Sequence, residues 1–177
     1  MIGFLYPEIC NQQGDQGYRD WLDVNGVKTV SAEDKPLAKL EGLVVGDVSE
    51  RGALILRERL VDHWLIGEIE KGLTILAIGR SGTELARLLG VEVPNGSYKS
   101  QYVEYEFEGT QLYGYVNGLH SLSKLVTEAP IGKGRLIQCA LLGPVCVVNR
   151  SFESYCFGIE TPERDALAEH YKNLVTD

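Results

Sequence analysis

The chain has 177 residues, of which 44% are hydrophobic and 24% charged, and these values predict one globular domain spanning residues 1–177. Seventeen basic against 25 acidic side chains leave a net charge of −8, and the basic residues are scattered along the chain. Nucleic acid is therefore not an expected partner, because phosphate contacts need a concentrated positive face.

Targeting and cysteine signals indicate a protein of the cytoplasm, with a component of a virus particle as the alternative. No apolar stretch approaches the roughly 18 residues of a membrane span, and the N-terminal residues 1–6 lack the basic region of a signal peptide. The four cysteines form no C-x-x-C pair and share no ligand spacing with the three histidines, so we expect buried thiols, no metal and no cofactor; they are Cys10, Cys139, Cys146 and Cys156.

The first half of the chain alternates short apolar runs with helical patterns. The runs 2–6, 43–45 and 73–78 predict parallel strands, the last one buried on both faces. Between them we expect a helix that starts near residue 18 and ends near Gly26, and a single amphipathic helix over 53–70. A further helix is expected from about 83 to 89, followed by Gly90. This order indicates an α/β fold.

The second half changes to an alternating pattern, which is typical of antiparallel strands. Apolar residues alternate with glutamates over 103–107, and residues 112–116 return after a turn at Glu108 and Gly109. Asn117 and Gly118 predict another hairpin turn. We therefore expect antiparallel additions from 102–116 to a central, mainly parallel sheet in a three-layer α/β sandwich.

Two more apolar strands and a helix complete the predicted fold. The runs 136–142 and 145–148, divided by Gly143 and Pro144, predict strands that also join the central sheet as antiparallel additions. Thr161 followed by Pro162 predicts the start of the last helix, because Pro is favoured at the first helical position.

The turn after the 73–78 strand is the first place to look for a site, because ligands gather at the carboxyl ends of parallel strands. Ser81 could be a nucleophile there, but the segment from Ser81 to Glu84 also matches the capping-box pattern of a helix start. We favour the capping role. We expect Arg80 to be ion-paired and to close the pocket; the alternative is that it points into an open cleft and binds an anion. The acidic partners available at this edge are Glu84, Asp47 and Glu50.

A catalytic Ser or Cys needs a base, usually His, and the chain offers few. His63 and His170 fall within predicted helices, where a surface or half-buried position is expected. His120 lies two residues past the predicted turn at 117–118 and is the best placed of the three for a functional role. The candidate pocket therefore consists of Arg80, Ser81, Gly82, Glu84, Asp47 and His120.

Several segments resemble the glutaminase subunit of the bacterial lipid II isoglutaminyl synthase, a class I, triad-type glutamine amidotransferase related to cobyric acid synthases. The opening is similar to the family's L-Y-P-x-x-x-N-x-x-G-D-x-G, the run 73–90 is similar to its nucleophile turn and helix, and 141–144 resembles its L-H-G-P. The segment 114–117 is faintly similar to G-F-E-N-H. The resemblance implies a flavodoxin-like fold and a family linked to peptidoglycan synthesis.

The catalytic residues that the resemblance implies are missing from this chain. Members use a Cys in a C-x-G-x-Q turn and a His in L-H-G-P, but here the Cys position falls on Arg80 or, in the other register, on Gly79. The His position falls on Leu142, whose side chain cannot transfer a proton. We therefore expect no catalytic residues of the family type.

These observations favour a catalytically inactive amidotransferase-like protein that acts by binding, either to a ligase-type partner or to copies of itself. One alternative is a structural subunit of a larger cellular or viral assembly. Another is a glutamine amidotransferase or hydrolase with a relocated nucleophile, for which Cys10, Cys139 and Ser81 are available, with His120 as base.

Overall fold

A computed structural model of the protein describes residues 1–10, 14–36, 38–61, 63–93, 97–107, 109–120, 125–139 and 162–177. A central sheet is built from β1 (Ile2–Phe4), β2 (Thr29–Ser31), β3 (Gly42–Val45), β4 (Thr74–Ile78), β7 (Val126–Ile131) and β8 (Gly134–Cys139). The helices are η1 (Pro7–Ile9), α1 (Gly14–Val24), α2 (Glu50–Arg59), α3 (Trp64–Lys71), α4 (Arg80–Leu88) and α5 (Pro162–Thr176). A separate two-stranded sheet consists of β5 (Ser97–Phe107) and β6 (Thr110–His120).

The strand order of the central sheet is β2-β1-β3-β4-β8-β7. The first five strands are parallel, and among the described strands of this sheet only the β7–β8 pair is antiparallel. An order of 2-1-3-4-5 among parallel strands is that of the flavodoxin-like fold, with its crevice between the first and third strands. The predicted fold class is therefore confirmed.

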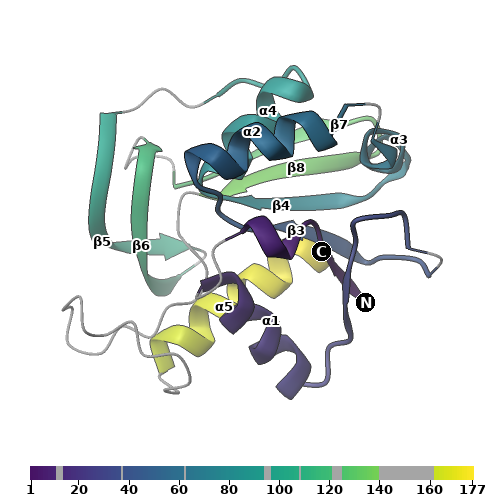
Figure 1. The fold of residues 1–177 in the computed structure, drawn as a ribbon. Helices are drawn as coiled ribbons and strands as arrows, with labels where there is room; N and C mark the ends of the chain where they lie inside the picture. Colours follow the sequence, from purple (N-terminus) through teal and green to yellow (C-terminus); the bar gives the residue numbers. More distant parts are fainter. Residues whose placement is uncertain are drawn as a thin grey trace.

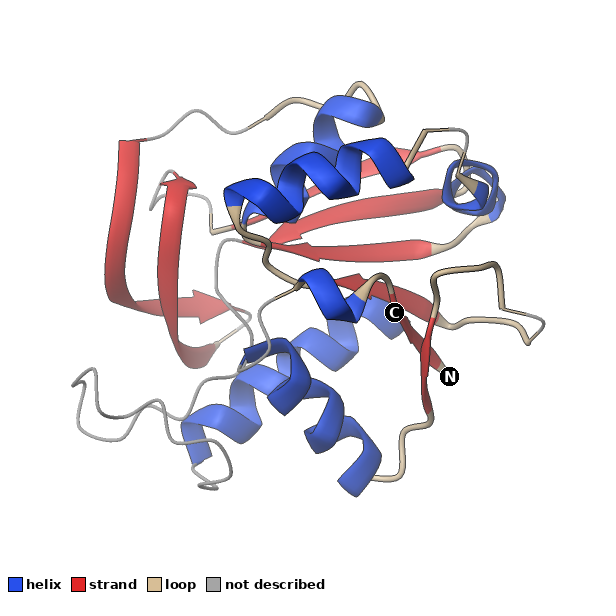
Figure 2. Ribbon diagram, in the orientation of Figure 1, coloured by secondary structure: helices blue, strands red, loops and turns tan. Residues whose placement is uncertain are grey.

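Helices cover both faces of the sheet, which gives the three layers (Figures 1 and 2). Alternate residues of β4 enter different cores: Leu76 and Ile78 pack with α1 and α5, whereas Ile75 and Ala77 pack with α2, α3 and α4. All four side chains are fully buried. Burial on both faces explains why this strand reads as a continuous apolar run in the sequence.

The helix predicted over 53–70 is two helices, α2 and α3, so that prediction is wrong. His63 has an extended backbone (φ −72°, ψ 144°), and its Nδ1 accepts a hydrogen bond from the N–H of Leu65 as the cap of α3. The apolar period continues across the break because Leu60 and Leu65 both reach the same core. Periodicity alone could not locate the break.

The second half of the sheet differs from the prediction in its pairing. The strand expected from residue 136 is β8, which pairs parallel with β4 rather than antiparallel, with Leu76 opposite Ile137. The antiparallel edge strand is β7, which was not predicted. Pro130 lies in β7, and an edge strand tolerates Pro because one side of its backbone needs no partner.

The predicted hairpin forms its own sheet and does not extend the central one. Its strands are joined between Phe107 and Thr110, which pair with each other, as expected, but Asn117 and Gly118 are not a turn: they lie in β6 and pair with Ser100 and Lys99 of β5. Figure 1 shows this hairpin on the side toward which the strands β4 and β8 point. The central sheet also contains β2, which was not predicted because only one of its three residues, Val30, is apolar.

The helix α5 begins at Pro162, as predicted. The strand predicted over 145–148, the Gly143–Pro144 turn and the cysteines Cys146 and Cys156 lie outside the described residues. None of the described helices has both the length and the apolar character needed to cross a bilayer.

Candidate strand-end site

The turn between β4 and α4 lies at the carboxyl end of a central strand and is formed by Gly79. Its backbone has φ 61° and ψ −130°, a conformation of the type found at the first central position of II′ turns, where glycine is preferred. The N–H of Gly79 donates to the carbonyl of Cys139, at the end of β8, over 2.7 Å. The chain therefore turns at Gly79, and α4 begins with Arg80.

Asp47 closes this turn from the neighbouring strand end. It follows β3, and its Oδ1 accepts a hydrogen bond of 2.9 Å from the backbone N–H of Arg80. A Cβ atom placed on Gly79 would lie only 2.2 Å from the same oxygen. Asp47 thus satisfies the first exposed N–H of α4, and its carboxylate occupies the space where a side chain at position 79 would start.

The environment of Asp47 disfavours its ionised form. Burial raises the pKa of this carboxyl to about 6, although hydrogen bonds from the backbone N–H groups of Arg80 and Val48, and the charge of Arg80, act in the opposite direction. A carboxyl group of this kind changes its charge between pH 5 and pH 7.

The Arg80 side chain is ion-paired, as predicted, and its partner is Glu50. Arg80 Nη1 lies 3.5 Å from Glu50 Oε1. The two side chains keep 38% and 87% of their surfaces exposed. Exposed pairs of this kind contribute little to stability, so the turn is held by the Asp47 contact rather than by the guanidinium.

Ser81 does not cap α4, so the predicted capping box is wrong. The cap position is Gly79, and the Ser81 hydroxyl is fully buried and donates toward the carbonyls of Ile78 (2.8 Å) and Val45 (3.0 Å). The next residue, Gly82, allows α4 to pack closely on β4, because a Cβ at this position would lie only 3.2 Å from the carbonyl oxygen of Ala77. Both residues fix α4 closely against β4.

Glu84 belongs to a different part of the molecule from the turn. Its carboxylate is buried, with 4% of the side chain exposed, and it is held by Arg57 and Arg87. The predicted site residues therefore separate into a strand-end group of Asp47, Arg80 and Ser81 and a helix-pair group around Glu84. His120 ends β6, but its side chain, like the whole of Leu142, lies outside the described residues.

The neighbouring strand end holds a strained residue that no sequence pattern revealed. Tyr6, which follows β1, has φ 46°, and among the described residues no other non-glycine residue has a positive φ. The Arg59 guanidinium lies over its ring, 4.7 Å from the centroid. Strained backbone of this kind gathers at functional sites, and Tyr6 lies at the strand pair β1–β3 where flavodoxin-like folds bind ligands.

The described residues offer no metal site: they contain no group of three or more His, Cys, Asp or Glu side chains that could hold an ion. Two of the cysteines are described, and both are buried thiols. The Cys10 thiol donates toward the carbonyl oxygens of Leu5 and Tyr6, and that of Cys139 lies 3.7 Å from the hydroxyl of Tyr171.

Comparison with known proteins returned structural neighbours only. No protein-family model matches the chain, and a search of characterised proteins gave no significant match. A GH42 β-galactosidase from G. stearothermophilus and its catalytic mutant are 13% and 14% identical, with TM-scores of 0.51 and 0.48. Each aligns with 98% of this chain, which spans only 29% of the enzyme.

A second neighbour is similar in length. A GMP synthase-like protein from Thermoplasma acidophilum is 13% identical, with coverage of 100% of this chain and 98% of that one, at a TM-score of 0.46. At these identities the likeness of the wild-type β-galactosidase, with its TM-score of 0.51, shows a shared fold and nothing about activity.

Proposed function

We propose that the chain is a catalytically inactive relative of the class I glutamine amidotransferases that acts through binding or assembly, with a ligase-type partner or with copies of itself. The observation that carries the proposal is the closed turn at Gly79. In the nucleophile turns of such folds a side chain projects from the sharp residue between strand and helix. Here that residue is a glycine, and the carboxylate of Asp47 fills the space.

The backbone donors of the turn support the same proposal. Nucleophile turns use the N–H of the next residue to stabilise the negative charge that develops on a substrate oxygen. The N–H of Arg80 holds that position and donates instead to Asp47, while the N–H of Gly79 donates to Cys139. A carboxylate at this donor repels the anion that catalysis would have to stabilise.

The three candidates for a relocated nucleophile, Ser81, Cys10 and Cys139, are poorly placed to attack a substrate. The hydroxyl of Ser81 is committed to backbone carbonyls, and its side chain has no exposed surface. Cys10 and Cys139 are buried as well, with 8% and 1% of their surfaces exposed. A buried thiol in apolar surroundings is inert, because its thiolate is disfavoured.

Release of glutamate from glutamine tests the proposal. We expect glutamate release by the purified chain to equal that of buffer alone over several hours at pH 7. This should hold both for the monomer and for any self-associated form that light scattering detects. Glutamate release that disappears in one of the variants Ser81→Ala, Cys10→Ser or Cys139→Ser would contradict it and would identify the relocated nucleophile.

A further inference from the structure

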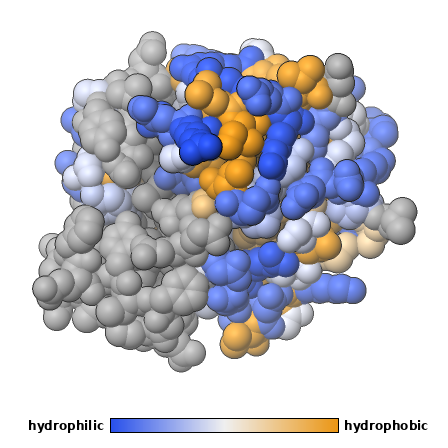
Figure 3. All heavy atoms as spheres, in the orientation of Figure 1, coloured by the Kyte–Doolittle hydropathy of each residue, from blue (hydrophilic) through white to orange (hydrophobic). Residues whose placement is uncertain are grey.

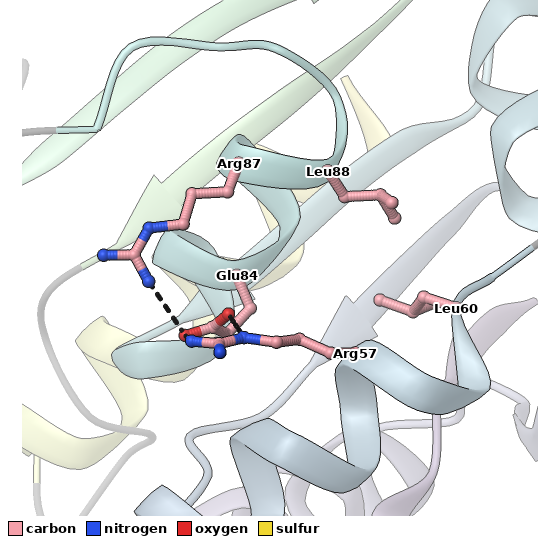
Figure 4. A pocket seen from close by; sticks show the side chains of 5 residues that line it. All are labelled: Arg57, Leu60, Glu84, Arg87 and Leu88. Atoms are coloured by element: carbon pink, nitrogen blue, oxygen red, sulfur yellow. Dashed lines mark hydrogen bonds and ion pairs between the residues drawn. The ribbon is translucent and has the colours of Figure 1, made fainter.

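Titratable side chains also gather away from the strand-end site. Between α2 and α4, Arg57 and Arg87 converge on Glu84 (Figure 4), and apolar side chains of these helices reach the surface beside them (Figure 3). These three charges bind one another, so this cluster is a link between helices. A second cluster surrounds His63 at the start of α3, and histidine is the side chain whose charge changes most readily near neutral pH.

Both ring nitrogens of His63 have a backbone partner. Nδ1 accepts a hydrogen bond of 3.3 Å from the N–H of Leu65 and so caps α3. Nε2 lies 3.3 Å from the carbonyl oxygen of Glu33, and because a carbonyl can only accept, Nε2 carries the proton. The geometry therefore requires the neutral imidazole, with its hydrogen on Nε2.

A second proton on this imidazole breaks the cap. In the imidazolium both nitrogens are donors, so Nδ1–H would point at the N–H of Leu65. The ring must then rotate out of the cap, or the first turn of α3 must open. The indole N–H of Trp64 also donates to the carbonyl of Glu33, at 3.3 Å. This contact does not depend on the charge of the imidazole, so α3 stays attached to the segment after β2 while it loses its cap.

The His63 ring also contacts Tyr6, the strained residue at the end of β1. The two rings meet edge to face, with centroids 5.7 Å apart and planes at 62°. A backbone with φ 46° persists only while its surroundings hold it in place. Because His63 is one of the side chains that pack on Tyr6, a movement of the imidazole reaches the strand end.

The charged groups around these two rings act in opposite directions. Burial lowers the pKa of His63 and so favours the neutral form, whereas the hydrogen bond to Glu33 and the charge of Asp34 favour the imidazolium. Asp34 is exposed, so it offers a carboxylate toward which a protonated ring can turn. The other charged side chains nearby are two ion pairs, Arg59 of α2 with Glu8 of η1 and Lys35 with Glu68 of α3.

We propose that His63 is a proton-sensitive switch. When neutral it caps α3 and packs on Tyr6; when protonated it leaves the cap, turns toward Asp34 and releases the first turn of α3. The switch goes beyond the proposed function, because it shares no residue with the turn at Gly79. It acts on the packing beside the end of β1, where flavodoxin-like folds bind ligands.

A pH titration of the full chain from pH 8 to pH 4.5, followed by NMR, tests the switch. The His63 ring should titrate with a midpoint below the ordinary 6.5. The amide of Leu65 and the ring of Tyr6 should shift with the same midpoint, because one proton moves all three. A midpoint at or above 6.5, or a Leu65 amide that does not follow the imidazole, would overturn the proposal.

Hydrogen exchange measures the opening of α3. The amides of Glu68 and Ile69 bond to carbonyls of the first turn, so their protection factors report its loss. Over the same pH range we expect these factors to fall about fivefold, the effect of losing a helix cap. His63→Asn is the matched variant, because Asn is a strong cap residue that does not titrate, and its protection factors should stay at their high-pH values.

His63→Ala cannot cap at any pH, so it should show the low protection factors throughout the range. A fall in His63→Asn as large as in the wild type would contradict the switch, since the opening would then not depend on the imidazole.

Asp34→Asn separates a switch from a merely structural cap. Asp34 takes no part in the cap but favours the protonated ring, so this variant should lower the midpoint of His63 and leave protection at pH 8 unchanged. Asp20→Asn is the control, because Asp20 is an exposed carboxylate of α1 that accepts from Gln16, and it should leave the midpoint where it is. An unchanged or higher midpoint in Asp34→Asn would also overturn the proposal.

Discussion

At the scale of single residues, Asp47 is the residue that closes the strand-end site. Its carboxylate supplies the cap of α4 across the β3–β4 edge and occupies the space beside Gly79. The sequence places both residues at strand ends that meet at one edge, so their proximity could be predicted from topology. The cap itself could not, because the local Ser81-x-x-Glu84 pattern points to a different solution.

The pH dependence of stability tests this role of Asp47. Its pKa in the folded protein, about 6, lies above the ordinary value of 3.8, so ionisation opposes folding. The favourable contribution of the neutral carboxyl is complete below pH 4 and is lost as the pH rises through 6. Asp47→Asn, whose amide oxygen can still accept from Arg80, should therefore gain stability over wild type by about 2 kcal/mol between pH 4 and pH 7.

The measurement is urea unfolding of both proteins at matched pH values. His170 acts in the opposite direction, since burial lowers its pKa to about 4 and its protonation destabilises the folded state as the pH falls below 6.5. This contribution is common to both proteins and cancels in the difference between them. A difference that stays constant or falls from pH 4 to pH 7 would show that Asp47 is not a destabilised carboxylate.

At the scale of elements, the pair α2 and α4 shows what sequence patterns can and cannot fix. The apolar spacing locates both helices, and Gly90 ends the second with φ 68°. The break before α3 was missed, because the cap by His63 leaves the apolar period intact. The link through Arg57, Glu84 and Arg87 joins residues up to 30 positions apart, so no local pattern reveals it.

Removal of Arg57 tests the link between the two helices. Arg57→Gln removes both hydrogen bonds from Arg57 to the buried carboxylate of Glu84 and leaves only the 3.3 Å contact from Arg87, and a buried charge that is only partly compensated is destabilising. We expect the melting temperature to fall by roughly 5–10 °C in thermal unfolding followed by circular dichroism. Arg59→Gln is the control, because Arg59 pairs with Glu8 at the surface and should cost about 2 °C or less. An equal decrease of the melting temperature in the two variants would mean that the Arg57–Glu84 ion pair adds no net stability.

At the scale of the whole molecule, the fold was more predictable than its sheet order. Continuous apolar runs such as 73–78 identify the buried parallel strands, because burial on both faces removes polar positions. The pairing of β8 with β4 depends on a long connection that no local signal specifies, so its direction was predicted wrongly. The same holds for the hairpin, whose alternation identifies the strands but not the sheet that they join.

In the molecule as a whole, an α/β sheet carries a strand-end turn that Asp47 closes to a side chain at position 79, as the proposed function requires. Two glycines allow a test, since Gly79 and Gly90 both have a positive φ, 61° and 68°. An alanine at either position is strained by the positive φ, and at Gly79 the ψ of −130° adds strain of its own. Only at Gly79 does the new Cβ also meet Asp47, whereas nothing lies within 4 Å at Gly90.

The most direct measurement is the free energy of unfolding of Gly79→Ala and Gly90→Ala from urea titrations. We predict a loss of about 1 kcal/mol for Gly90→Ala, from backbone strain alone. For Gly79→Ala we predict a loss of about 3 kcal/mol or more, because the ψ of −130° adds backbone strain and Asp47 must also give up its position against Arg80. Equal losses in the two variants would contradict the account, since they would mean that the turn has room for the side chain of a nucleophile.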